Sequence, residues 1–392
     1  MRYVLGVSVV LAAFLITHFV FGETQHNQHK KDHQQDPESH EAAWPEKVEE
    51  DEFNAGESII EHIIDSHEWH IATIGEKHIS IPLPVILWHE GELHIFMSSK
   101  FHHGHASYKG FRLMTEGEMK GRIVREPFTE EYNYLDEEVV AVEKEDGDKE
   151  YSMPLDLSIT RNVAAIIISM IIMSWIFISI AKSYKKRKGE APKGLQSLLE
   201  PLIVFIRDDL AKEAIGEKKY ERYLPFLLTL FFFIFLNNLL GLVPFFPGGT
   251  NVTGNIGVTG VLAAFTFLII TFNANKAYWK HIFNTPGVPW WLKLPIPIMP
   301  LVEFLGILTK PFVLMVRLFA NITAGHIIIL GFISLIFIFG NLQPALGYGV
   351  SPVSVLFAVF MGLLELLVAF IQAYVFTLLS ALYFGMAIEE SH

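Results

Sequence analysis

Long apolar runs dominate the second half of the chain. An apolar run from Val163 to Ala181 precedes five basic residues between positions 182 and 188, and no Asp, Glu, Lys or Arg occurs from Pro225 to Asn275. A helix of about 20 apolar residues is long enough to cross a bilayer. Positive charge beside a span stays in the cytoplasm, so the first run predicts a membrane helix that enters from outside.

The remaining apolar sequence divides into four further spans. The Pro-Gly-rich turn at 244–249 separates Leu224–Val243 from Val252–Phe272, and two longer apolar segments follow at 297–339 and 350–388, joined by an uncharged loop. At about 1.5 Å per residue, each of the last two exceeds a hydrocarbon core of about 30 Å, so tilts or kinks are expected. The fold class predicted is an all-α polytopic membrane protein with five membrane helices and a cytoplasmic carboxy-terminus.

A sixth helix is predicted between the first and second spans. Residues 195–222 carry Leu and Ile at spacings of three and four, followed by mixed charges. An apolar stripe with charged flanks indicates a helix lying on the cytoplasmic membrane surface.

The amino-terminal third has a different character. Met1-Arg2, an apolar run ending at Phe21, and Gly22 predict a signal peptide at 1–22, with an uncleaved anchor as the alternative. Residues 23–160 carry 31 acidic against 12 basic side chains, whereas 161–392 carry 11 against 17. This asymmetry indicates two compartments.

We therefore expect an acidic, His-rich linker at 23–66, a small extracytoplasmic domain at 67–155 and a membrane channel domain at 160–392. Short alternating stretches at His78–Ile81 and Leu93–Phe96 favour a β-rich outer domain. The 13 histidines between 23 and 155 show no fixed ligand spacing, and there is no cysteine. We expect neither a metal nor a cofactor, and no nucleic-acid partner.

Ionisable residues inside the last two spans are the candidate functional groups. Glu303, Lys310 and Arg317 recur every seven residues, close to one helical face, and Asn321 shares it. His326 lies about half a turn away in phase. Because charge in mid-bilayer costs at least about 2.5 kcal/mol, such groups usually face a water-filled path or a partner.

Each group also has a structural interpretation. Glu303 and Lys310 could extend to the cytoplasmic interface. His326 and Glu365 could form a simple hydrogen bond between helices, and Gln372, seven residues after Glu365, could join helices through its amide. Arg317 is harder to explain this way, because its guanidinium stays protonated and lies well within an apolar segment.

At these residues the sequence resembles subunit a of F-type ATP synthases. The segment Leu308–His326 is similar to that family's arginine motif, with Lys310-Pro311 followed by Arg317-Leu318-Phe319-Ala320-Asn321 and Ala324-Gly325. Glu365 and the run Ile371–Phe376 resemble its closing helix, and Asn237–Pro244 and Asn251–Asn255 its preceding hairpin. The resemblance covers roughly 160–390.

The resemblance implies a non-catalytic proton-translocating stator subunit in a bacterial inner membrane. Arg317 takes the place of the essential arginine, Asn321 of its neighbouring amide and Gln372 of the facing glutamine. His326 and Glu365 occupy two channel positions that many members fill in the opposite order, and Glu303 is a further candidate. The implied partners are a ring of carboxyl-bearing membrane subunits, a peripheral-stalk membrane subunit and the rest of the synthase.

Two other functions are compatible with a polytopic chain. A self-contained secondary transporter would show broken helices or repeated halves, and neither is visible. A membrane anchor for the outer domain would leave Arg317 without a role.

Overall fold

The computed structural model describes residues 56, 65–74, 77–115, 119–125, 152–187, 189–243, 246–283 and 298–388. The predicted signal peptide 1–22 and most of the linker 23–66 lie outside these residues. The chain forms two compact units. One contains His62–Gln196 and Leu236–Val252, and the other contains Met1–Glu61, Ser197–Phe235 and Thr253–His392.

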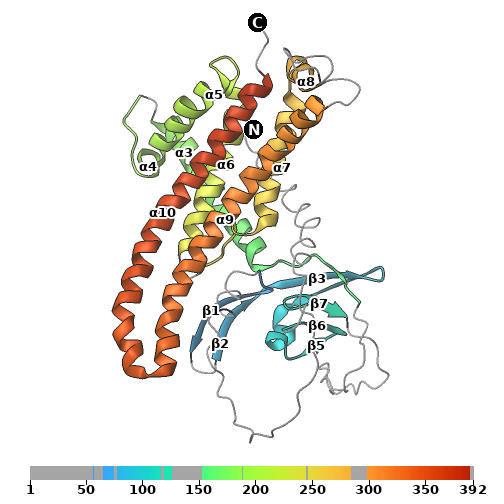
Figure 1. The fold of residues 1–392 in the computed structure, drawn as a ribbon, viewed down its shortest axis with the longest axis vertical. Helices are drawn as coiled ribbons and strands as arrows, with labels where there is room; N and C mark the ends of the chain where they lie inside the picture. Colours follow the sequence, from blue (N-terminus) through green and yellow to red (C-terminus); the bar gives the residue numbers. More distant parts are fainter. Residues whose placement is uncertain are drawn as a thin grey trace, which may run out of the picture. The chain divides into compact units, whose positions relative to one another are not determined.

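Five helices in the described part of the chain are long and apolar enough to cross a membrane, as predicted. They are α3 (Arg161–Lys186), α6 (Tyr220–Leu242), α7 (Ile256–Asn273), α9 (Ile298–Leu342) and α10 (Pro344–Ile388) (Figure 1). Asn255 caps the first turn of α7, since its side-chain oxygen accepts a hydrogen bond from the Gly257 amide.

Helices α9 and α10 form a long antiparallel hairpin. Each has 45 residues and is therefore about 67 Å long. The prediction of a loop between 339 and 350 was wrong, because only Gln343 separates the two helices. Pro344 begins α10 at a position where a missing N–H costs no hydrogen bond. A Cβ on Gly347 would lie 2.8 Å from Cα of Gly340, so glycine lets the two helices approach closely near their turn.

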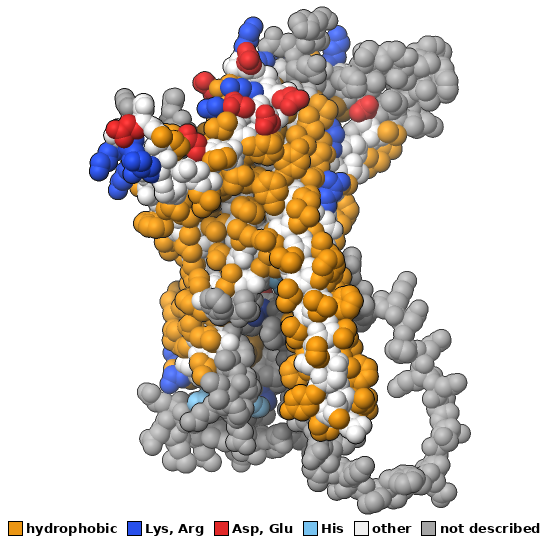
Figure 2. All heavy atoms as spheres, turned by 90° about the vertical axis from the view of Figure 1, so that its left-hand side faces the viewer, with side chains coloured by type: hydrophobic (Ala, Val, Ile, Leu, Met, Phe, Trp, Pro, Cys, Tyr) orange, Lys and Arg blue, Asp and Glu red, His pale blue; other side chains and the backbone are white. Residues whose placement is uncertain are grey.

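The predicted sixth helix is present in pieces. Helix α4 (Leu195–Phe205) continues into the π-helical η3 (Ile206–Lys212) and the short α5 (Glu213–Ile215). The expected loop after α7 instead contains helix α8 (Lys276–Phe283). Figure 2 shows apolar side chains along the α9–α10 hairpin, with acidic and basic side chains gathered towards one end.

The outer domain is built from short antiparallel strands. Strand β1 (Glu68–Ile74) pairs with β2 (Lys77–Pro82). Strand β3 (Pro84–His89) lies between β4 (Glu92–Met97) and β8 (Leu155–Asp156). The 3-10 helix η2 (Ser98–Gly104) leads to a third sheet of β5 (Ser107–Tyr108), β6 (Phe111–Leu113) and β7 (Ile123–Arg125).

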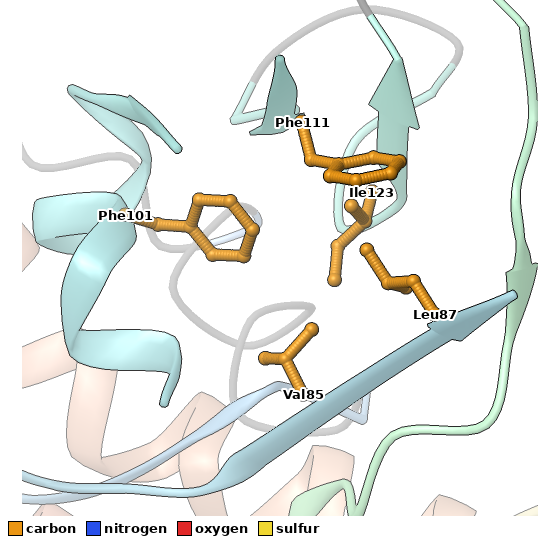
Figure 3. Packing of buried hydrophobic residues seen from close by; sticks show 5 residues of the cluster. All are labelled: Val85, Leu87, Phe101, Phe111 and Ile123. Carbon is orange, nitrogen blue, oxygen red and sulfur yellow. The ribbon is translucent and has the colours of Figure 1, made fainter. Parts of the chain in front are cut away.

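A small apolar core holds this domain together. Val85 and Leu87 point from β3 towards Phe101 of η2, Phe111 of β6 and Ile123 of β7 (Figure 3). The three larger side chains Leu87, Phe101 and Phe111 are fully buried. Burying one such side chain contributes about 1.5–3 kcal/mol. The two expected alternating stretches lie in β2 and β4.

The outer domain is hydrogen-bonded to the first turn of α3. The Arg161 amide donates to the Ser66 carbonyl at 2.8 Å. The Asn162 amide donates to Oδ1 of Asp65 at 3.0 Å. A carboxylate that accepts from a first-turn amide stabilises a helix N-terminus. The domain and α3 are therefore joined by hydrogen bonds as well as by the chain.

Candidate ion path in the membrane helices

Arg317 lies on an exposed, otherwise uncharged stripe of α9. Val313, Val316, Ala320 and Ala324 share this exposure, at helical spacings of three and four. The guanidinium is close enough to Tyr383 of α10 to influence it electrostatically. Within the described part of the chain, however, no hydrogen bond or ion pair engages it. A permanent cation is thus exposed on the surface of the described helices.

Asn321 lies one turn after Arg317 and is also exposed. Its position on the arginine's face is the one that the spacing of four predicts. The amide and the guanidinium are therefore exposed side by side.

Glu303 and Lys310 are two polar residues in the first half of α9, before Arg317. Lys310 Nζ lies 5.2 Å from the centre of the Tyr383 ring. Glu303 interacts electrostatically with Lys310 and with Tyr278 of α8. Burial, assisted by Glu303, raises the pKa of the Tyr278 hydroxyl. Lys310 and Arg317 are seven residues apart on nearly the same helical face, and both act on Tyr383 of α10.

His326 and Glu365 are brought together across the hairpin, although 39 positions separate them in the sequence. Nδ1 of His326 lies 2.5 Å from Oε1 of Glu365, and Glu365 is only 4% exposed. The same Nδ1 lies 3.2 Å from the Ile322 carbonyl oxygen. In this geometry neither carboxylate oxygen of Glu365 accepts a hydrogen bond from any described residue. The two groups are therefore close, and the Glu365 carboxylate is buried and incompletely satisfied.

Gly325 makes the close approach of Glu365 possible. A Cβ at this position would lie 2.9 Å from Oε1, 3.0 Å from Cδ and 3.2 Å from Cγ of Glu365. Any side chain would push the carboxylate away from His326. The sequence indicates Gly325 only as part of a motif, because the residue it contacts lies on another helix.

Gln372 shares the buried face of α10 with Glu365, as their spacing of seven predicts, and is 6% exposed. In the described part of the chain no hydrogen bond joins it to Arg317. Gln372 is thus buried, whereas Arg317, which it was expected to face, is exposed. Ser380 and Thr266 continue a polar line between α10 and α7, with their hydroxyl oxygens 3.5 Å apart.

Helix α7 packs on the same region of α9. The Thr323 hydroxyl donates to the Gly254 carbonyl at 3.4 Å. A Cβ on Gly260 would lie 3.3 Å from Sδ of Met315. The described residues contain no group of three His, Cys, Asp or Glu side chains arranged to hold a metal ion. The polar groups present are suited to moving protons and attracting a carboxylate.

These features define a class of protein. Among the described residues of the five membrane helices, the exposed Arg317 and the His326–Glu365 pair lie well away from the helix ends, where most of the other charges are. Such an arrangement is typical of a multi-pass membrane protein that provides an ion path and completes it with a partner.

Comparison with known proteins specifies the family. The model of the ATP synthase A chain family matches residues 163–385, which is more than half of the sequence. The chain belongs to this family, whose members are membrane subunits of the ATP synthase complex. The self-contained transporter is not favoured.

Relatives support the same assignment. The chain is 48% identical over 245 residues to ATP synthase subunit a of Chloroherpeton thalassium, covering 60% of this chain and 69% of the relative. It is 47% identical over 242 residues to subunit a 2 of Chlorobaculum tepidum, covering 60% and 65%. Against subunit a of Myxococcus xanthus it is 44% identical over 245 residues, covering 61% and 75%.

The outer domain matches a separate family model. Residues 58–157 match a domain of unknown function. The match ends where α3 begins, so the outer domain and the channel region are two distinct family units in one chain.

Proposed function

We propose that this chain is the proton-translocating stator subunit of a rotary F-type ATP synthase. The observation that carries the proposal is the Arg317 guanidinium, held on an exposed uncharged face of α9 without a hydrogen-bond or ion-pair partner among the described residues. A cation at membrane depth needs a compensating group, and a carboxylate on a rotating ring of partner subunits supplies one.

Arg317 acts through its permanent charge. A carboxylate arriving beside it is stabilised in its ionised form, which lowers its pKa and favours release of its proton. The same charge repels a free proton and so separates an outer half-path from an inner one. The membrane potential drives the transfer with about 2.3 kcal/mol per charge per 100 mV. Asn321 assists by presenting its amide beside the guanidinium.

His326 and Glu365 form the relay of the outer half-path in this proposal. Their Nδ1–Oε1 separation of 2.5 Å lets a proton pass between imidazole and carboxylate. The incompletely satisfied carboxylate leaves room for a water molecule or an incoming proton. Gln372 extends the buried polar line on α10, and Glu303 belongs to the inner half-path with Lys310 and Tyr278.

The topology is inferred from charge. The basic residues that close α3 are placed in the cytoplasm, so the outer domain at 67–155 is extracytoplasmic and the carboxy-terminus cytoplasmic. The membrane is a bacterial inner membrane. The chain performs no bond chemistry itself, and it works with the carboxyl-bearing ring, a peripheral-stalk membrane subunit and the remaining synthase.

Replacing the cation tests the proposal. Arg317→Ala should leave the complex assembled but abolish ATP-driven acidification of inverted vesicles, measured with a pH-sensitive dye. Val316→Ala, next to Arg317 on the same face, is the matched control and should pump normally. Arg317→Lys should also pump poorly, because an ammonium shielded from water at membrane depth can lose its proton and lacks the planar fork. Normal acidification by Arg317→Ala at wild-type complex levels would refute the proposal.

A further inference from the structure

The outer domain carries an apolar sheet face that its own core does not use. On β3, Val85 and Leu87 point into the core, whereas Trp88 is 46% exposed. Cross-strand partners continue the uncovered face, since Trp88 is opposite Leu93 and Leu155, and Ile86 is opposite Ile95. This open face of the β4–β3–β8 sheet consists of Ile86, Trp88, Leu93, Ile95, Met97 and Leu155.

The open face contains no charged side chain, and its most exposed member is Ile95, at 60%. Alternation along antiparallel strands normally places polar residues on the side that faces water. Contiguous exposed apolar residues on a sheet instead mark a surface that is covered in use. A tryptophan within such a face is typical of the membrane–water interface, where the ring sits at headgroup level.

The connection to α3 places this face beside the bilayer. After β8, the Leu157 and Ile159 amides donate to the carbonyls of Ile86 and Pro84, so the chain follows β3 to its first residue. Thr160 then precedes α3, and the hydrogen bonds that Asp65 and Ser66 accept from the first turn of α3 fix that junction. Four residues separate β8 from a helix that crosses the membrane. They span at most about 17 Å.

The orientation of the sheet also agrees with a bilayer beside its open face. In Figure 1, β5, β6 and β7 lie on one side of β3, and α3 leaves the sheet on the other. The core therefore occupies the side away from the membrane helix, and the open face is turned towards the side on which the bilayer begins.

We propose that the open face of the β4–β3–β8 sheet rests on the outer leaflet of the bilayer, with Trp88 and Ile95 at the headgroup–acyl boundary. The occupant is lipid, because the face is continuous with the interface that α3 already crosses. The outer domain is then held flat on the membrane.

Site-specific fluorescence tests the contact. The chain has no cysteine. In an assembled synthase whose other subunits have no reactive cysteine, a single Ile95→Cys label therefore reports from the open face alone. The matched control is His105→Cys, an exposed position that follows η2 across the core. Both complexes are reconstituted in phosphatidylethanolamine–phosphatidylglycerol vesicles, with ATP-driven acidification as the check on assembly.

Lipids with a nitroxide near the headgroup should quench the label at position 95 at least twofold more than the label at 105. Iodide, supplied on both sides of the membrane, should show the reverse preference. Equal quenching by lipid at both positions would overturn the proposal. A label at 95 that neither lipid nor iodide reaches would also overturn it, since a protein would then cover the face.

Discussion

Two His–carboxylate pairs in this molecule have similar chemistry but different surroundings. In the outer domain, Nε2 of His67 lies 2.8 Å from Oδ2 of Asp156, and Oδ1 of Asp156 accepts from the Ser158 amide at 2.9 Å. In the membrane hairpin, Nδ1 of His326 lies 2.5 Å from Oε1 of Glu365, yet neither oxygen of Glu365 accepts a well-aligned hydrogen bond from any described residue.

The difference fits a structural role for the outer pair and the proposed proton-handling role for the hairpin pair. Asp156 has both oxygens engaged, so its charge is fixed and it tethers the last strand to the segment before β1. A buried carboxylate left incompletely satisfied is costly, and such groups occur where a proton, water or ligand is exchanged. A histidine and a carboxylate therefore hold the domain together in one place and, in the proposed function, serve transport in the other.

The largest effect is expected from removing the charge of the hairpin pair. Glu365→Gln keeps the size of the side chain but cannot take up and release a proton at Oε1. Proton pumping should fall on the order of 10²-fold, the usual contribution of a positioned acid–base group. The measurement is the initial rate of ATP-driven acidification per assembled complex. Unchanged pumping would show that this pair has only a structural role, like His67–Asp156.

A smaller effect should follow from displacing the pair without altering its chemistry. Gly325→Ala introduces a Cβ within 2.9 Å of Oε1 of Glu365, which forces the carboxylate to move. We expect a several-fold loss of pumping and an overpacking cost of about 1–3 kcal/mol. Gly331→Ala is the matched control on α9, because nothing lies within 4 Å of a Cβ there. Equal rates for the two variants would contradict the assigned role of Gly325.

The smallest effect on transport is expected at the outer pair. Asp156→Asn should leave pumping intact and destabilise the outer domain by roughly 1–3 kcal/mol, because buried His67 loses its charged partner. Hydrogen exchange of the β3 and β8 amides in the whole complex measures this. A loss of pumping at full assembly would show that the outer pair is not merely structural.

The outer pair also predicts a pH dependence. Burial opposes the charge on His67, but the Asp156 hydrogen bond prevails and raises its pKa above 6.5. Burial likewise opposes the charge on Asp156, but His67 prevails and lowers its pKa below 3.8. The histidine's stabilisation is complete below its unfolded pKa and is lost as pH rises through the folded one. The aspartate's is present above its unfolded pKa and lost as pH falls through the folded one.

The pair therefore stabilises the domain most between about pH 4 and pH 6.5. After correction for intrinsic exchange rates, β8 amides should be better protected at pH 6 than at pH 8 in the wild type. Asp156→Asn should abolish this difference. An undiminished difference in the variant would assign the pH dependence to other groups.

Much of the membrane fold was predictable because lipid imposes a local rule. Uncharged runs of sufficient length predicted all five spans, and Glu365 and Gln372 share a buried face as their spacing predicted. The start of α10 was missed, because Gly and Pro near the hairpin turn resemble a loop but here permit close packing. Helix α8 was missed because its eight residues are short for a periodic signal.

Long-range contacts were the part that sequence could not supply. Asp156 lies 89 positions after His67, and β8 pairs with a strand far earlier in the chain. No local pattern indicates either partner. The contact of Gly325 with Glu365 is of the same kind. The open sheet face could be recognised only once β3, β4 and β8 were aligned, since Leu93 and Ile95 also suit a buried strand.

The central claim is that Arg317 faces a partner carboxyl rather than its own subunit, and cysteine cross-linking tests this most directly. Ala320→Cys, one turn along the exposed face, is paired with a cysteine beside the ring subunit's carboxyl in the assembled synthase. Leu318→Cys, at a position only 1% exposed, is the control. The account predicts an oxidative cross-link at 320 and none at 318. An assembled complex with no cross-link at 320, or equal yields at both positions, would contradict it.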